Sequence, residues 1–355
     1  MRREIKRGRR RARRLLGRRR LEIGSGWIVG AAALAVAVGV TALLEGRRRE
    51  ADIRSLVAYA RERRMEPVEL IEAAGRANRI VFLGDVHAAR APKWLAADAI
   101  EALARGPGLD AVVLEIGADQ QPYIDAYLAS EPENATILFA HPRTLHQARG
   151  VDREFLEIYH RVWTLNNEFG PGRRIRILAA DLPGWPPDRR LAPPVAARRY
   201  AARDAYMEQV IEREVLAGDP SARILIFMGG YHGLKHGGAT LDVAGARPVR
   251  VTWLAARLQQ RHPGEVFTIL PDAPQGRAPR GDVVAYAATR AFDLLRSNLG
   301  DAGASFGLRV DERFDFLTAP ILEADLPGLE MSLDPQEYTL KDVIDGYLFL
   351  GGQAF

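Results

Sequence analysis

The sequence predicts an α/β fold with a largely parallel central sheet flanked by helices, preceded by one transmembrane helix. Short apolar runs of strand length alternate with longer stretches of helical periodicity, as in parallel sheets with helical crossovers. These runs are continuously apolar, which indicates strands covered on both faces. A separate apolar stretch near the N-terminus is long enough to cross a bilayer.

A basic tail and an apolar segment open the chain. Residues 1–22 contain 12 Lys and Arg against Glu4 and Glu22, which leaves 38 basic and 43 acidic residues in the remainder. Residues 23–44 carry no charge. At about 1.5 Å per residue, this segment would span roughly 33 Å as a helix. We expect residues 1–22 to form a cytoplasmic tail and residues 23–44 a single-pass transmembrane helix, because positive charge marks the cytoplasmic side.

This topology predicts a cell-membrane protein whose folded domain is extracytoplasmic and whose first partner is the lipid bilayer. Retention of the segment is favoured over cleavage, since the run exceeds the ~7–15 residue core of a signal peptide. Nucleic acid is not an expected partner, because the basic tail has no aromatic residue to stack on a base. The absence of cysteine excludes disulfides, thiolate nucleophiles and cysteine zinc sites.

Beyond the membrane segment, we expect a helical connector over residues 45–78 and a single α/β domain over residues 79–355. Residues 51–77 have helical spacing, with Pro67 as a first-turn residue. Residues 271–340 are loosely assigned as an insertion within this domain, because they contain no motif that we recognise. Six apolar runs predict strands: Ile80–Leu83, Ala111–Ile116, Ile175–Ala180, Ile224–Met228, Val266–Leu270 and Tyr347–Leu350. Helical patterns cover Pro92–Ala104, Arg153–Phe169, Pro194–Leu216 and Val251–Arg261.

Ionisable side chains follow or end four of the predicted strands. Asp85 and His87 come after the first, Glu115 lies at the end of the second, Asp181 ends the third, and His232 follows the fourth. Ligands of open parallel sheets bind outside the carboxyl ends of the strands. We therefore expect these side chains to form one site, in which Asp85 holds His87 in one tautomer.

Each residue also has a structural interpretation. A histidine after a strand is commonly a hydrogen-bonded loop residue, Glu115 could form a salt bridge to an arginine, and Asp181 could start a turn. Arg203 and Asp204 either approach the same edge of the sheet or form an ordinary salt-bridged helix face.

Two further patterns are weak. His232 and His236 have the spacing of a helical metal pair, but Gly233 stands where a metalloprotease has glutamate. The G-x-S-x-G pattern at residues 303–307 has no histidine after it in the chain, so we do not expect Ser305 to be a nucleophile.

Five motifs occur in an order that resembles a known superfamily: "FLGDVH", "VVLEIGADQQPYIDAYL", "ILAADLP", "RDAYMEQVI" and "ILIFMGGYHG". The superfamily groups ChaN-type haem-binding proteins, erythromycin-esterase-like hydrolases and Tiki-type metal-dependent proteases. The chain looks most similar to the ChaN-type branch, over roughly residues 79–236. Asp85 departs from the pattern, because glutamate is commoner there.

The resemblance implies three different sites. In the Tiki-like branch, His87, Glu115 and His232 would hold a divalent metal, with Asp181 beside them. Zn, Mn, Fe or Co suits such donors. In the esterase-like branch, the same histidine and glutamate positions would support general acid–base attack by water. In the ChaN-type branch, a surface pocket would bind haem. No motif identifies its ligands in this chain, and Tyr231 and His236 are the residues that we consider as candidates.

The presence of the whole acid–histidine set favours hydrolysis, because haem binding places no demand on Asp85 or Glu115. We expect a membrane-anchored extracytoplasmic hydrolase with catalytic His87, Glu115, His232 and Asp85, either metal-dependent or using general acid–base chemistry. The alternatives are a haem-binding protein of iron uptake and a non-catalytic envelope protein. The sequence does not identify a small-molecule or peptide substrate.

Overall fold

A computed structural model of the full chain describes residues 48, 50–87, 89–140, 152–185, 191–243, 247–272, 295, 297–299, 304–314, 329–333 and 338–350. The chain divides into two compact units, Met1–Asp52 and Ile53–Phe355, and the second contains every strand described. The predicted basic tail and transmembrane segment lie outside the described residues. Among the residues that are described, no helix is long and apolar enough to span a bilayer.

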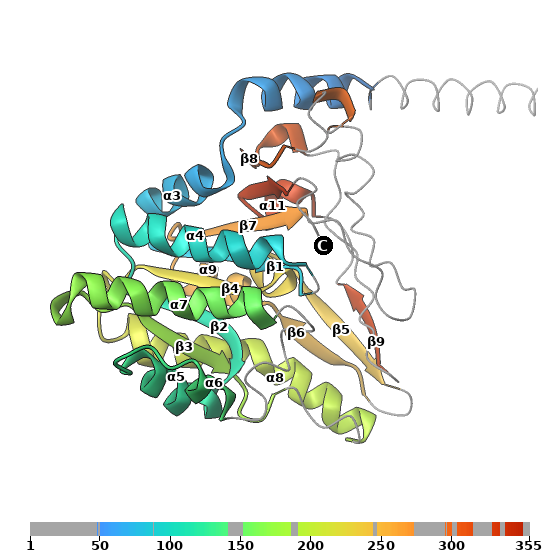
Figure 1. Cartoon of the computed structure of the whole chain (residues 1–355). Helices are drawn as coiled ribbons and strands as arrows, with labels where there is room; N and C mark the ends of the chain where they lie inside the picture. The colour runs from blue at the N-terminus through green and yellow to red at the C-terminus, as the bar shows by residue number, and fades with distance from the viewer. Residues whose placement is uncertain are drawn as a thin grey trace, which may run out of the picture. The chain divides into compact units, whose positions relative to one another are not determined.

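The predicted α/β fold is confirmed, with a seven-stranded sheet at its centre (Figure 1). The strand order is β3-β2-β4-β1-β7-β10-β8, and all neighbours are parallel except β10 and β8. Six of these strands are the predicted ones. The bounds are β1 (Ile80–Asp85), β2 (Ala111–Gly117), β3 (Arg176–Asp181), β4 (Ile224–Gly229), β7 (Val266–Asp272), β8 (Phe306–Arg309) and β10 (Gly346–Phe349).

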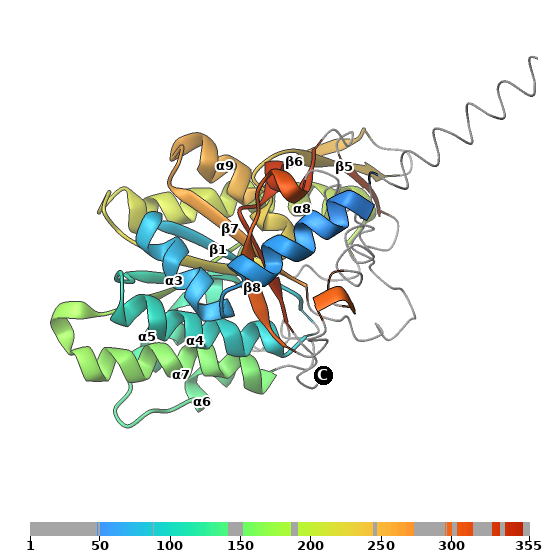
Figure 2. The same ribbon diagram turned by 90° about the horizontal axis from the view of Figure 1, so that it is seen from above.

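Helices cover both faces of this sheet. Figure 2 shows α3, α4 and α7 on one side and α8 and α9 on the other. The bounds are α3 (Pro67–Ala77), α4 (Ala91–Arg105), α5 (Gln121–Leu128), α6 (Thr136–Phe139), α7 (Asp152–Phe169), α8 (Pro193–Ile211), α9 (Leu254–Arg261) and α11 (Leu340–Val343). The chain continues from α8 into a π-helical turn over Glu212–Leu216.

Alternate side chains of each strand enter two different cores. On β1, Val81 and Leu83 pack with α4 and α7, whereas Ile80 and Phe82 pack with α8 and α9. All four are almost completely buried. The continuous apolar runs in the sequence therefore reflect a sheet covered on both faces, as predicted.

The sequence did not predict a second, antiparallel sheet in the order β6-β5-β9. Its strands are β5 (Gly238–Val243), β6 (Val249–Thr252) and β9 (Leu329–Leu333). The predicted helix over Val251–Arg261 was wrong at its start, because β6 runs to Thr252 and α9 begins only after Trp253. The loosely assigned insertion provides β8 to the large sheet and β9 to the small one.

The helical stretch predicted over residues 51–77 consists of two helices. Residues 53–63 are helical, and α3 begins at Pro67, the predicted first-turn residue. Between them, Met65 exchanges backbone hydrogen bonds of 3.0 and 2.8 Å with Gly307 and so ties the connector to β8. Ser305 lies just before β8 rather than between a strand and a helix, so the G-x-S-x-G pattern is not a nucleophile turn.

Candidate active site

Four neighbouring strands bring the predicted site residues to one edge of the sheet. β3, β2, β4 and β1 are adjacent and parallel, so their carboxyl ends coincide. The register of β2 against β3 shifts between Leu114 and Gly117. Such an irregularity re-aims a side chain next to an active site, and here it falls at Glu115.

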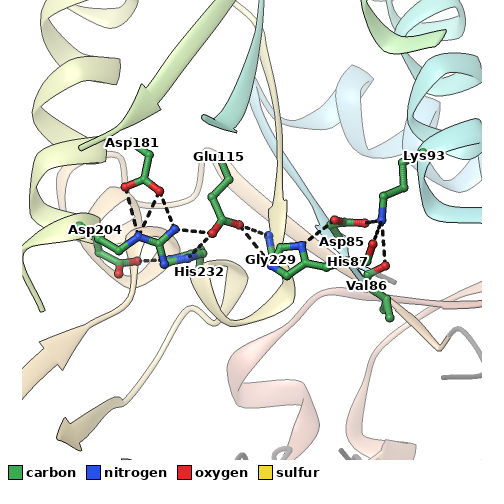
Figure 3. Close-up of polar contacts among 10 residues, drawn as sticks. Asp85, Val86, His87, Lys93, Glu115, Asp181, Asp204, Gly229 and His232 are labelled. Carbon is green, nitrogen blue, oxygen red and sulfur yellow. Dashed lines mark hydrogen bonds and ion pairs between the residues drawn. The ribbon is translucent and has the colours of Figure 1, made fainter. Parts of the chain in front are cut away.

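Glu115 lies between two imidazoles (Figure 3). Nε2 of His87 is 3.8 Å from Oε2 of Glu115, and Nε2 of His232 is 3.6 Å from Oε1. The glycine turns after β1 and β4 therefore meet at one carboxylate. The His87 side chain is 38 % exposed, whereas that of His232 is only 5 % exposed. The site thus opens to solvent on the side of His87.

His87 is held through its other ring nitrogen. Its Nδ1 lies 2.9 Å from Oδ2 of Asp85, as predicted for a carboxylate that sets the tautomer. The second oxygen of Asp85 accepts a 2.7 Å hydrogen bond from Nζ of Lys93, which is buried. Burial alone would raise the pKa of Asp85, but the ammonium of Lys93 and the His87 imidazole outweigh it and lower that pKa.

His232 has its own carboxylate partner, Asp204. The distance from His232 Nδ1 to Asp204 Oδ1 is 2.7 Å, and the same oxygen accepts a 2.6 Å bond from the backbone N–H of Leu254. Burial opposes the charged imidazole, but the negative charges of Asp204 and Glu115 outweigh it and raise the pKa of His232 to about 10. His232 is therefore an imidazolium at neutral pH.

Arg203 on α8 connects Glu115 to Asp181. Its guanidinium contacts Oε1 of Glu115 and makes bonds of 3.1, 3.1 and 2.6 Å to the Asp181 carboxylate. Its Cζ lies 4.0 Å from the centre of the Trp185 ring, a cation–π contact. The salt bridge considered as the structural interpretation of Glu115 is therefore present in the same site.

These charges keep Glu115 ionised. Burial would raise its pKa, but the positive charges of Arg203 and His232 hold the pKa of Glu115 well below its usual value. The backbone N–H of Gly229 adds a 2.9 Å hydrogen bond to Oε2. A Cβ at Gly229 would lie 3.1 Å from that oxygen and 3.2 Å from the His87 ring, so glycine keeps this space open.

The predicted metal ligands do not fit a metal in this arrangement. In the part of the chain that the structure describes, no group of three or more His, Asp and Glu side chains is arranged to hold an ion. The Arg203 guanidinium already binds the Asp181 carboxylate and Oε1 of Glu115. A metal ion would have to compete with this cation for the same oxygens.

Tyr231 and His236, the candidate haem ligands, each pack against another aromatic ring. The Tyr231 ring packs against Trp253, with ring centres 6.1 Å apart. His236 is exposed and stacks on Tyr338 at 5.9 Å.

The sequence interpretation missed Lys93 as a site residue and left Arg203 and Asp204 undecided. The lysine gave one signal, since it stands in the apolar helical stretch "APKWLAADAI", where a core position is expected. For Arg203 and Asp204, periodicity could not show that they contact Glu115 and His232.

Comparison with known proteins identifies relatives by fold. No protein-family model and no curated protein matches the chain. Among solved structures, a mutant of the erythromycin esterase EreC in its open conformation is 13 % identical, covers 79 % of this chain and 92 % of its own, and has a TM-score of 0.53. A Bacillus cereus protein is 10 % identical, with coverages of 84 % and 97 % and a TM-score of 0.58.

A third structure, a succinoglycan biosynthesis protein, is 10 % identical, covers 84 % of this chain and 96 % of its own, and has a TM-score of 0.51. At these identities the likeness shows the fold. The resemblance to the erythromycin-esterase-like group, predicted from five short motifs, is confirmed at that level.

Proposed function

We propose that this chain is a hydrolase in which His87, Glu115 and His232 direct the attack of water on a carboxylic ester. The observation that carries the proposal is that two imidazoles, each held through Nδ1 by its own aspartate, face one ionised carboxylate from opposite sides. The fold shared with an erythromycin esterase supports the reaction class.

His87 is the general base. Its Nδ1–H is donated to Asp85, so the nitrogen that can act as base is Nε2, which faces Glu115. The gap of 3.8 Å is too long for a direct hydrogen bond. A water at about 2.8 Å from both atoms would donate one proton to each of them. Such a water loses its proton to Nε2 as its oxygen attacks the ester carbonyl.

His232 is the general acid. It is the charged imidazole of the pair, since its pKa is raised to about 10. Its Nε2–H faces the site because Nδ1 is already bound to Asp204. In the proposed reaction this proton moves to the leaving oxygen as the carbon–oxygen bond breaks. The reaction therefore consumes water and releases an acid and an alcohol.

Glu115 orients both partners without changing its own charge. Its low pKa keeps it an acceptor for the attacking water on one side and a counter-charge for His232 on the other. Arg203 holds this carboxylate in place, because its guanidinium binds both Glu115 and Asp181. Arg203 is a positioning residue here, because it reaches the reacting atoms only through Glu115.

The membrane anchor remains part of the proposal, because residues 23–44 suit a bilayer span and the basic residues precede them. The hydrolase would then act outside the cytoplasm. A reporter enzyme that is active only in the cytoplasm, fused after Phe355, should be silent. An active reporter would reverse the orientation.

The hydrolase proposal is tested with the full-length protein and p-nitrophenyl acetate as the probe. His87→Gln and Glu115→Gln should each lower kcat by about 10²-fold or more, the usual scale for general acid–base groups. His160→Gln is the matched control. His160 also pairs with a carboxylate, that of Glu133, but it lies on α7 and not at the carboxyl edge of the sheet. Unchanged turnover in His87→Gln would overturn the proposal. A saturable Soret shift with haemin and no ester hydrolysis would support the haem-binding alternative.

A further inference from the structure

We infer that Lys93 is a positioning residue that determines which side-chain atom of residue 85 faces His87. Its catalytic consequence rests on the proposed function. Lys93 is the third residue of α4 and its side chain is 1 % exposed. Its Nζ lies 2.7 Å from Asp85 Oδ1 and 2.9 Å from the carbonyl oxygens of Val86 and His87 (Figure 3).

Three acceptors therefore use the three N–H groups of the ammonium. A lysine ammonium has no acceptor, so the atom of residue 85 that faces Lys93 must itself accept. This requirement commits Oδ1 of Asp85 to Lys93 and leaves Oδ2 for His87 Nδ1, 2.9 Å away. Because Oδ2 also can only accept, the proton lies on Nδ1, and Nε2 is free to receive a proton from water.

The same ammonium also fixes the turn that carries His87. It bonds the carbonyls of two consecutive residues, Val86 and His87, and so joins the turn after β1 to the start of α4. The backbone and the ring of His87 are therefore oriented by one buried group. A buried ion pair adds little net stability compared with apolar packing, so orientation is the better account of a lysine at this core position.

The second imidazole lacks this arrangement. Asp204 uses one oxygen for both His232 and the Leu254 N–H, and its Oδ2 is buried without a hydrogen-bond partner. None of the ion pairs between described residues joins Asp204 to a lysine or arginine; its partner is His232. The two His–Asp pairs therefore differ. Asp85, the partner of the solvent-facing His87, has a lysine on its second oxygen, whereas the second oxygen of Asp204 has no hydrogen-bond partner.

This difference gives a suppressor experiment. In Asp85→Asn, the amide oxygen must face Lys93, so the NH2 group faces His87 and forces the proton onto Nε2. The base is then blocked, and kcat for p-nitrophenyl acetate should fall by up to about 10⁴-fold, the scale of a wrong histidine tautomer. In Asp85→Asn/Lys93→Met the amide can turn over, and kcat should recover by about tenfold or more.

The tautomer itself is measured by ¹⁵N NMR of the full-length protein labelled at its 7 histidines, with His87 assigned from its missing signal in His87→Gln. Nδ1–H is expected in the wild type and the double variant, and Nε2–H in Asp85→Asn. Lys235→Met is the matched control, because Lys235 is a part-buried lysine paired with Asp345. Combined with Asp85→Asn, it should restore neither the tautomer nor kcat.

Three outcomes decide between the proposals. If Asp85→Asn/Lys93→Met keeps the tautomer of Asp85→Asn, the role of Lys93 is overturned. If that variant does not fold, Asp85→Asn/Lys93→Gln replaces it, since a glutamine amide can accept as well as donate, and failure of rescue there overturns the role equally. If the wild type hydrolyses no ester but the tautomers change as expected, the proposed function fails while the positioning role of Lys93 holds.

Discussion

His87 and His232 reach the same carboxylate from opposite sides, with Nε2 atoms 3.8 and 3.6 Å from the two oxygens of Glu115. They follow β1 and β4, which are neighbours in the sheet and pair Asp85 with Gly229 at their ends. Parallel neighbours release their following loops at the same edge. The site therefore follows from strand order, although its two histidines are far apart in the sequence.

Removing the Arg203 side chain should destabilise the fold as well as the site. Arg203→Met leaves the carboxylates of Asp181 and Glu115 buried without their shared cation. Breaking one partner of a buried ion pair lowers the free energy of unfolding by about 3–5 kcal/mol. Urea denaturation of the variant measures this change.

The matched control for Arg203 is Arg213→Met. Arg213 pairs with Glu214, but its side chain is 64 % exposed. Exposed pairs contribute about 0–1 kcal/mol. Equal stability losses in the two variants would show that the ion pairs of Arg203 are no stronger than surface pairs.

Much of this arrangement could be predicted from local sequence. The six parallel strands were readable because each is buried on both faces and therefore continuously apolar, as Ile80–Phe82 illustrates. Asp85, His87, Glu115 and His232 could be placed at one edge because they follow or end such strands. The two histidines lie close together because the strands that precede them, β1 and β4, are neighbours in the sheet.

Other features depend on contacts that the sequence does not encode locally. β5 and β9 form one sheet although they are far apart in the chain, and β5, "GATLDV", has no long apolar run. From the sequence, Arg203 could equally have formed a salt bridge at the surface. It is buried because its guanidinium packs against the Trp185 ring in the folded chain. Lys93 stands at an expected core position of its helix, but the sequence could not show that its acceptors are two backbone carbonyls and one side chain.

Adding one methyl group at Gly229 should impair catalysis more than folding. The new Cβ would lie 3.1 Å from Glu115 Oε2 and 3.2 Å from the His87 ring, close enough to displace both. A misplacement on the order of 1 Å can lower rates by about 10²-fold. The shift required here is a few tenths of an ångström, so we expect Gly229→Ala to lower kcat for p-nitrophenyl acetate by about tenfold.

Gly172→Ala is the control for this substitution, because a Cβ there would meet no atom within 4 Å. It should leave both kcat and the thermal midpoint unchanged. A Gly229→Ala variant that retains full kcat would contradict the proposed position of the water between His87 and Glu115.

Chelation should leave ester hydrolysis unchanged. The reason is the Arg203 guanidinium, which contacts Glu115 and Asp181 and supplies the positive charge that a metal would bring to those oxygens. Elemental analysis of the purified full-length protein, followed by activity measurements with and without EDTA, tests this. A stoichiometric metal whose removal abolishes turnover and whose return restores it would favour the metal-dependent alternative.

The pKa of His232 makes two predictions with a defined sign. As the proposed general acid it must be protonated, so the alkaline limb of kcat/KM, the fall at high pH, should lie at about pH 10. Its folded pKa also lies above its ordinary value of 6.5. Its contribution to stability is therefore fully present below about pH 6.5 and is lost as the pH rises to about 10.

Asp204→Asn removes one of the carboxylates that raise this pKa while retaining an oxygen for the Leu254 N–H. The alkaline limb of kcat/KM should therefore move to lower pH. The unfolding free energy should fall at correspondingly lower pH. Asp98→Asn, at an exposed pair with Arg161, should change neither profile. If Asp204→Asn keeps the wild-type alkaline limb, then His232 is not the group that titrates there, and the assignment of His232 as the acid and His87 as the base is wrong.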